Sequence, residues 1–216
     1  DEVDEAARLC GAINTVVNTR DENGNVTGKL KGYNTDGMGY WQGIKEEGID
    51  FKGMKMVLIG TGGAATAIAV RGALDGLGEL AIFNIKDKFW ANAEETVKKI
   101  RENTDCIVNL YDLDDKDKLR EEIADSYLFA QATGVGMKPL EGQTVVPDET
   151  YFRPDLIVTD TVYAPRETET LRLAKKAGCK TMNGLGMMLF QGDAAFHLWT
   201  GKHMPIDHMK EVLDIK

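Results

Sequence analysis

From Lys55 onward, short apolar segments alternate with segments of helical character, and this alternation limits the fold more than any other feature. The first apolar segment, Met56 to Ile59, precedes a glycine-rich turn and an alanine-rich stretch over residues 64–77. A short continuous apolar run is typical of a strand that is buried on both faces, as in a parallel sheet. The pattern predicts an α/β fold: a doubly wound, Rossmann-like parallel sheet of about six strands.

Later segments extend the same pattern. Apolar runs predict five more strands, at residues 80–83, 106–110, 127–131, 156–160 and 180–182. Apolar residues at helical spacing predict further helices over residues 36–47, 89–103, 116–124, 168–177, 187–200 and 206–215.

The sequence before the first apolar run is organised differently and predicts a hairpin. Residues 13–18 favour a strand, Asn23-Gly24-Asn25 is typical of a turn, and residues 26–33 can return as a second strand. A hairpin alone has too little core to form a domain. We therefore predict three parts: residues 1–34 as the C-terminal remnant of another domain, 35–186 as the Rossmann domain, and 187–216 as terminal helices that pack back toward the first part.

The glycine-rich turn is the first candidate site. Gly60-Thr61-Gly62-Gly63-Ala64 follows a predicted strand and opens a predicted helix, which is the context of a dinucleotide-binding loop. Glycine lets the backbone turn tightly and approach a pyrophosphate, and the helix N-terminus offers free N–H groups. The chain has 23 glycines but only 5 prolines, which favours close backbone approach over flexible linkers. A tight turn without a ligand is the alternative.

The segment after the second strand bears on the choice of cofactor. In this fold that strand end reaches the adenosine ribose. Asp87 could accept hydrogen bonds from the ribose hydroxyls of NAD, whereas Lys86 could pair with the 2′-phosphate of NADP. The two side chains indicate different cofactors, and a solvated charge pair is a third interpretation.

Three further polar positions are candidates with ordinary structural alternatives. Asp36 begins a predicted helix, where capping the helix is the simplest role. Asn14 and Thr15 could bind a polyol or close a turn. Gln191 lies in a largely apolar helix, where a buried amide needs a partner; an exposed position is the alternative.

Composition excludes several classes of function. The chain has 26 Lys and Arg against 35 Asp and Glu, a net charge of −9, and its basic residues form no cluster, which argues against nucleic acid and anionic membranes as partners. No apolar run reaches the roughly 18 residues that a membrane span needs. The three cysteines lie far apart, which favours a reducing, cytoplasmic location. The histidines have no partner at metal-ligand spacing, so no metal site is predicted.

Four segments, in this order, resemble the shikimate and quinate/shikimate dehydrogenase family. They are Gly11-Ala12-Ile13-Asn14-Thr15, Gly32-Tyr33-Asn34-Thr35-Asp36-Gly37, Gly60-Thr61-Gly62-Gly63-Ala64, and Asn183-Gly184-Leu185-Gly186-Met187 with Gln191. The resemblance covers essentially the whole chain, and the second segment is the most specific. It implies an NAD(P)-dependent enzyme of the shikimate pathway of aromatic amino acid biosynthesis. Such an enzyme reversibly oxidises a ring hydroxyl of shikimate or quinate to a ketone.

The resemblance also implies roles for individual residues. Asp36 would be the catalytic carboxylate that contacts the substrate hydroxyl. The substrate would be bound by Asn14, Thr15, Tyr163 and Gln191. The cofactor would contact Gly60, Thr61, Gly62, Gly63, Ala64, Asn84, Lys86, Asp87, Thr133, Val162, Tyr163 and Gly184. Residues 1–34 would be the remnant of the family's substrate-binding domain.

The chain departs from the family pattern in three places. The family's catalytic lysine and a serine pair that binds the substrate carboxylate would lie before Asp1, so we expect residues 1–216 alone to bind NAD but to turn over shikimate poorly. The family's N-A-T-S-x-G-M segment reads Gln131-Ala132-Thr133-Gly134-Val135-Gly136-Met137 here. Ile85-Lys86-Asp87 carries one base and one acid, which resembles the NAD-accepting branch.

NAD is therefore the expected cofactor, with NADP as the alternative, and shikimate or quinate is the expected small-molecule partner. A homodimer is a further expectation. A non-enzymatic dinucleotide-binding or ligand-sensing module on the same fold is the alternative function.

Overall fold

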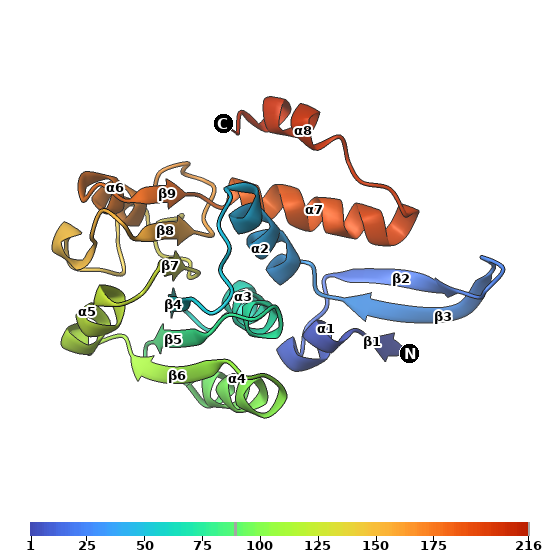
Figure 1. Ribbon diagram of the computed structural model, residues 1–216, viewed down its shortest axis with the longest axis horizontal. Helices are drawn as coiled ribbons and strands as arrows, with labels where there is room; N and C mark the ends of the chain where they lie inside the picture. Colours follow the sequence, from blue (N-terminus) through green and yellow to red (C-terminus); the bar gives the residue numbers. More distant parts are fainter. Residues whose placement is uncertain (89, 216) are drawn as a thin grey trace.

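The computed structural model describes residues 1–88 and 90–215, and a six-stranded parallel sheet forms its centre (Figure 1). The strand order is β6-β5-β4-β7-β8-β9, which confirms the predicted doubly wound α/β fold. The strands are β4 (Lys55–Ile59), β5 (Glu79–Asn84), β6 (Ile107–Asp112), β7 (Leu128–Gln131), β8 (Ile157–Asp160) and β9 (Lys180–Met182).

Helices cover both faces of this sheet. They are α2 (Asp36–Glu46), α3 (Gly63–Leu74), α4 (Trp90–Asn103), α5 (Lys116–Ala124) and α6 (Glu169–Lys176), with a short 3-10 helix η1 (Glu149–Tyr151). Met56 and Leu58 of β4 belong to the core shared with α2, α3 and α4, whereas Val57 and Ile59 belong to the core shared with α5 and α6. Burial on both faces explains why β4 is a continuous apolar run in the sequence.

Two predicted helices end earlier than expected. Helix α3 stops at Leu74 rather than residue 77, because Gly76 adopts a φ of +102° that cannot continue a right-handed helix. The last helix, α8 (Ile206–Leu213), ends before Asp214, whose φ is +49°. Helix α4 is described from Trp90; Phe89, its predicted first residue, lies outside the described residues.

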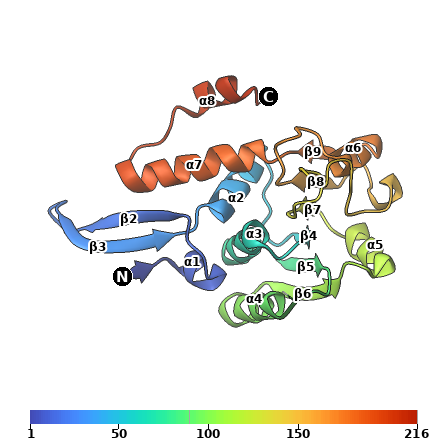
Figure 2. The same ribbon diagram turned by 180° about the vertical axis from the view of Figure 1, so that it is seen from behind.

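A three-stranded sheet precedes the parallel one. The predicted hairpin is confirmed as β2 (Thr15–Arg20) paired antiparallel with β3 (Val26–Tyr33). It projects away from the parallel sheet, as Figures 1 and 2 both show. The sequence did not predict β1 (Glu2–Val3) or α1 (Glu5–Cys10), which complete this part.

Helix α2 lies between α3 and the long helix α7 (Leu185–Thr200), and glycines allow both contacts (Figure 2). A Cβ atom at Gly37 would lie 2.3 Å from the carbonyl oxygen of Ala67 in α3. A Cβ atom at Gly39 would lie 2.4 Å from the backbone nitrogen of Gln191 in α7. Part of the glycine surplus therefore serves helix packing rather than a ligand.

The two terminal helices make different contacts. In α7, the indole Nε1 of Trp199 donates to the carbonyl oxygen of Val16 in the hairpin, at 3.0 Å. In α8, Lys210 pairs with Glu46 of α2 at 3.1 Å, and Arg166 donates to the carbonyl oxygen of Leu213 at 2.8 Å. No helix within the described ranges is both long and apolar enough to cross a bilayer.

Candidate cofactor groove and active site

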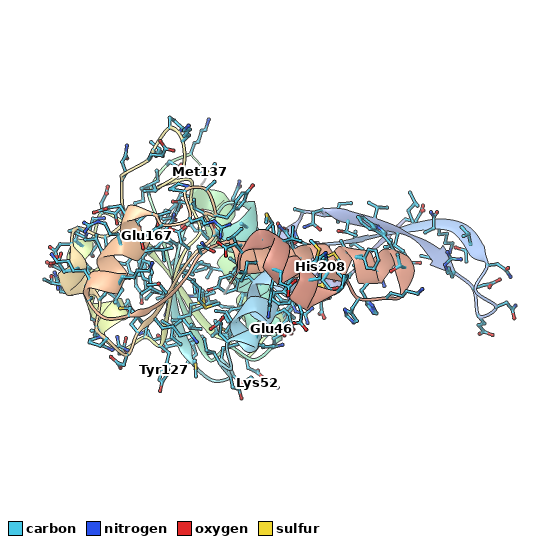
Figure 3. All side chains as sticks on the ribbon, turned by 90° about the horizontal axis from the view of Figure 1, so that it is seen from above. Glu46, Lys52, Tyr127, Met137, Glu167 and His208 are labelled. Carbon is cyan, nitrogen blue, oxygen red and sulfur yellow. The ribbon has the colours of Figure 1, made fainter. Side chains whose placement is uncertain are left out.

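A groove of about 490 Å³ lies at the carboxyl ends of the central strands. In Figure 3, Met137, which lines this groove, lies on one side of the molecule. Tyr127 and Lys52, which precede β7 and β4, lie on the opposite side, where the strands begin. The chain leaves β4 toward β5 on one side, while β7 pairs with β4 on the other. Ligands of doubly wound sheets bind at this kind of switch point.

The glycine loop forms one wall of the groove. Gly60 has a φ of +108°, and a Cβ atom there would lie 2.8 Å from the carbonyl oxygen of Ala132, so the tight turn requires glycine. Gly62 and Gly63 are different, because a Cβ atom at either would meet nothing within 4 Å. Their backbone therefore faces open space in the groove.

The N-terminus of α3 begins at this open space. Its N-cap is Gly62, and no side chain caps the free N–H groups of the first turn. Uncapped N–H groups and the positive end of the helix dipole favour an anion. The loop and helix together therefore fit the pyrophosphate of a dinucleotide.

The opposite wall of the groove is a loop held by Gln131. This fully buried side chain donates from Nε2 to the carbonyl oxygen of Val135 at 2.8 Å, and its Oε1 accepts from the backbone nitrogen of Thr133 at 2.6 Å. Gln131 replaces the asparagine of the family segment, and here its longer amide shapes the loop rather than pointing into the groove.

Asp160 joins this loop to the one that follows β8. Its Oδ2 accepts from the Thr168 hydroxyl at 2.6 Å, and its Oδ1 accepts from the backbone nitrogen of Val162 at 2.9 Å and from Gln131 at 3.4 Å. Burial raises the pKa of this carboxyl to about 6, although these hydrogen bonds oppose the shift. Asp160 was not singled out in the sequence, where it reads only as the end of a buried strand.

The ribose end of the groove contains two of the three expected side chains. Asn84 and Asp87 line it, together with Ile85 and Leu113. Lys86 is not among the lining residues. Its Nζ lies 3.5 Å from a carboxylate oxygen of Asp112, at the end of the neighbouring strand β6.

The expected catalytic carboxylate, Asp36, contacts Asn14. The Nδ2 of Asn14 donates to Oδ1 of Asp36 at 2.9 Å. The Oδ1 of Asn14 accepts from the hydroxyls of Thr15 and Thr35, at 3.0 and 3.2 Å, and these bonds orient its amide toward Asp36. Partial burial raises the pKa of Asp36, and the hydrogen bond from Asn14 lowers it in part.

Asp36 does not cap its helix, so that interpretation is wrong. Thr35 is the N-cap residue, and Asp36 lies in the first turn of α2. The next residue, Gly37, packs against Ala67, about one turn into the helix that the glycine loop opens. This packing places the first turn of α2 against Ala67 and Arg71 of α3.

Gln191 faces α2 and is half-buried rather than exposed. Its Cβ lies 2.7 Å from the position that a Cβ atom at Gly39 would take. Gly39 lies three residues beyond Asp36 in α2. Gln191 therefore packs against α2 about one turn away from Asp36.

Besides Lys86, three expected cofactor contacts lie outside the groove lining. Val162 is buried and Tyr163 is half exposed in the loop after β8, of which only Thr161 lines the groove. A Cβ atom at Gly184 would lie 2.0 Å from the carbonyl oxygen of Thr161, so this glycine allows close packing of the two backbones.

The histidines and cysteines form no metal centre. The Nδ1 atom of His203 is hydrogen-bonded to Oδ2 of Asp193 at 2.8 Å. The His203 ring stacks on that of His197 at a centroid distance of 4.3 Å. No group of three or more metal-ligating side chains occurs within residues 1–88 and 90–215. Burial raises the pKa of the Cys10 and Cys106 thiols to about 11.

A glycine loop at the switch point of a doubly wound sheet, with an uncapped helix N-terminus beside it, defines a dinucleotide-binding protein. Comparison with known proteins identifies the family. The family model of the shikimate 5'-dehydrogenase C-terminal domain matches residues 184–213. A shikimate dehydrogenase (NADP(+)) of Listeria monocytogenes serotype 4b is 53% identical over 213 residues, which are 99% of this chain and 71% of that protein.

Solved structures agree with the sequence comparison. The crystal structure of shikimate 5-dehydrogenase from Listeria monocytogenes in complex with shikimate and NAD has a TM-score of 0.92 and 52% identity, covering 99% of this chain and 71% of that one. The quinate dehydrogenase from Corynebacterium glutamicum in complex with NAD has a TM-score of 0.81 and 30% identity, with the same coverage. The chain belongs to the shikimate dehydrogenase family.

Proposed function

We propose that this protein transfers a hydride between a nicotinamide dinucleotide and a ring hydroxyl of shikimate or quinate. The observation that carries the proposal is the Asn14–Asp36 pair, at the end of α2 that packs against α3, the helix that the glycine loop opens. A polyol-binding amide, a carboxylate and a dinucleotide loop are thus neighbours in one molecule. Family membership adds independent support.

The cofactor is held by the groove at the switch point. Gly62, Gly63 and the first turn of α3 bind the pyrophosphate, while Asn84 and Asp87 bind the adenosine ribose. Thr133, on the loop that Gln131 holds, lies on the opposite wall. The bound nicotinamide supplies or accepts the hydride, and the protein fixes its position.

The substrate is held near Asp36. Asn14 and Gln191 bind ring hydroxyls, Thr15 orients the Asn14 amide, and Tyr163 closes the nicotinamide side of the site. Asp36 accepts a hydrogen bond from the hydroxyl that is oxidised. Its raised pKa suits a group that exchanges a proton during the reaction.

NAD is the preferred cofactor in this proposal, and NADP is the alternative. Asp87 lines the ribose end of the groove, where a carboxylate suits the two ribose hydroxyls and disfavours a phosphate. Lys86, the nearest candidate for the phosphate of NADP, is paired with Asp112.

A cellular location and an oligomeric state are also proposed. The three thiols are free, which fits a cytoplasmic protein. The acidic net charge of −9 supports the proposal that the protein binds no nucleic acid. A homodimer is proposed separately. Sedimentation velocity of the full-length protein tests the homodimer directly.

The proposed reaction is tested by following reduced nicotinamide in the full-length protein. Shikimate and quinate are each offered with NAD and with NADP, and malate serves as a non-cyclic hydroxy acid control. We expect turnover with a cyclic substrate and none with malate. Tight dinucleotide binding without turnover of either cyclic acid would favour a ligand-sensing module instead.

A further inference from the structure

Lys86 and Asp112 face one another at the carboxyl ends of two neighbouring strands. Asn84, the last residue of β5, is paired in register with Asp112, the last residue of β6. The Lys86 ammonium reaches across this edge to within 3.5 Å of the Asp112 carboxylate. The pair therefore lies immediately beside the ribose end of the groove, which Asn84 and Leu113 line.

Both members of the pair are held on the β6 side. The second carboxylate oxygen of Asp112 accepts from the backbone nitrogen of Asp114 at 3.0 Å, so the acidic side chain is fixed. The Lys86 ammonium also lies over the ring of Trp90, 5.5 Å from its centroid. These contacts direct the lysine along the outer edge of the sheet rather than into the groove.

The neighbouring segment is acidic on balance. Residues 112–118 contain four aspartates and two lysines, and both lysines are engaged: Lys116 donates to the Leu113 carbonyl oxygen at 2.7 Å, and Lys118 pairs with Glu122 at 2.6 Å. A 2′-phosphate placed here would carry close to two negative charges. Lys86, the cation that follows the end of β5, is paired with the Asp112 carboxylate.

We infer that Asp112 is a specificity-determining residue, which selects NAD over NADP by engaging Lys86. This inference rests on the proposed function, because it concerns the cofactor of the same groove. When Asp112 loses its charge, Lys86 is free to turn toward a 2′-phosphate and pair with it. NAD lacks the phosphate, so its affinity is not affected.

The test is Asp112→Asn in the full-length protein, with dissociation constants for NAD and NADP measured by calorimetry. Asparagine keeps an acceptor for the Asp114 backbone nitrogen, so the strand end is preserved. We expect the affinity for NADP relative to that for NAD to rise about tenfold or more over the wild-type ratio. This is the size of effect expected from one freed lysine beside the phosphate. The matched control is Asp117→Asn, which removes an exposed charge of the same segment that is not paired with Lys86.

The same measurement with Lys86→Ala decides whether the lysine carries the effect. In the Lys86→Ala background we expect Asp112→Asn to leave the NAD-to-NADP ratio unchanged within about twofold. An unchanged ratio in the single variant, or an equal change with and without Lys86, would overturn the inference. A wild type that binds neither dinucleotide would overturn both the proposed function and this inference. A wild type that binds a dinucleotide, with a ratio that Asp112→Asn leaves unchanged, would overturn the inference alone.

Discussion

The side-chain amide of Asn14 donates to the carboxylate of Asp36 at 2.9 Å, across 22 residues of sequence. Asn14 immediately precedes β2 of the hairpin, and Asp36 opens α2 against the parallel sheet. The bond thus joins the two parts of the molecule at the point where the substrate is proposed to bind. It also opposes the rise in the carboxylate's pKa that burial causes, because it favours the ionised form.

Asn14→Ala is predicted to raise the pKa of Asp36 further. The variant removes the hydrogen bond that lowers this pKa, while the burial that raises it remains. The pKa is measured by NMR titration of the side-chain carboxyl carbons, with Asp36→Asn used to assign the signal. An Asp36 pKa that stays the same or falls in Asn14→Ala would contradict the role given to the amide.

Gly62→Ala and Gly63→Ala are predicted to weaken dinucleotide binding without destabilising the protein. An added methyl group meets no protein atom within 4 Å at either position, so it enters only the space assigned to the pyrophosphate. We expect a loss of about tenfold or more in cofactor affinity, since one lost close contact or hydrogen bond to a charged group costs about 1.5–3 kcal/mol. Calorimetry and thermal unfolding separate the two effects.

Gly60→Ala is the contrasting variant of the same loop. Its φ of +108° and the Ala132 carbonyl oxygen at 2.8 Å make the added methyl group a folding defect. We expect a clear fall in the melting temperature. If Gly62→Ala were equally destabilised, the open space beside that residue would not be a cradle for a ligand.

Gly39→Ala is predicted to disturb the α2–α7 contact. The new Cβ atom would lie 2.4 Å from the Gln191 backbone nitrogen and 2.6 Å from the Met187 carbonyl oxygen, so the helices must move apart. Overpacking of this kind costs about 1–3 kcal/mol of unfolding free energy. The matched control is Gly43→Ala in the same helix, where the nearest atom is 3.6 Å away and where alanine is expected to be neutral or slightly stabilising.

Asp160 is predicted to make the protein less stable as the pH rises through 6. Its pKa is raised from 3.8 to about 6, so the folded protein holds this proton more tightly than the unfolded chain. The resulting stabilisation is complete below the unfolded pKa and is lost as the pH rises through the folded one. It amounts to about 3 kcal/mol for a shift of this size.

Asp160→Asn removes this contribution, because an amide does not titrate. Denaturant unfolding of both proteins between pH 4 and pH 7, which brackets the pKa of about 6, gives the difference in slope. The exposed Asp207→Asn serves as the charge-matched control. Parallel pH profiles of wild type and Asp160→Asn would show that folding does not raise the pKa of Asp160, contrary to the burial argument.

Much of the parallel sheet could be predicted because its strands are buried on both faces. The apolar run of β4 and the glycine loop after it have local signatures that do not depend on distant contacts. Helix ends were less predictable, as Gly76 shows: a glycine that stops a helix by its φ looks the same in sequence as one that packs within it. Strand β1 depends on its pairing with β3, a tertiary contact, whereas α1 has local signals that were overlooked: the Asp4 side chain caps its N-terminus and Gly11, at a φ of +69°, ends it.

The site could be predicted only in part, for a similar reason. The loop residues Gly60 to Ala64 are contiguous and were found together. Gln131 and Asp160 form their network across neighbouring strands, and in the sequence each is only the last residue of a buried run. A polar residue at the carboxyl end of a buried strand was the available signal, and it was visible at both positions.

The turnover number of Asp36→Asn in the full-length protein, assayed with shikimate and quinate at saturating cofactor, tests the account most directly. The dissociation constant of the cofactor is measured for the same variant and for the wild type. The account predicts that turnover falls by about 100-fold or more, the usual contribution of an acid–base group, while cofactor affinity stays within about twofold because Asp36 is outside the groove lining. Turnover within about twofold of the wild type would contradict the assignment of Asp36 as the catalytic carboxylate.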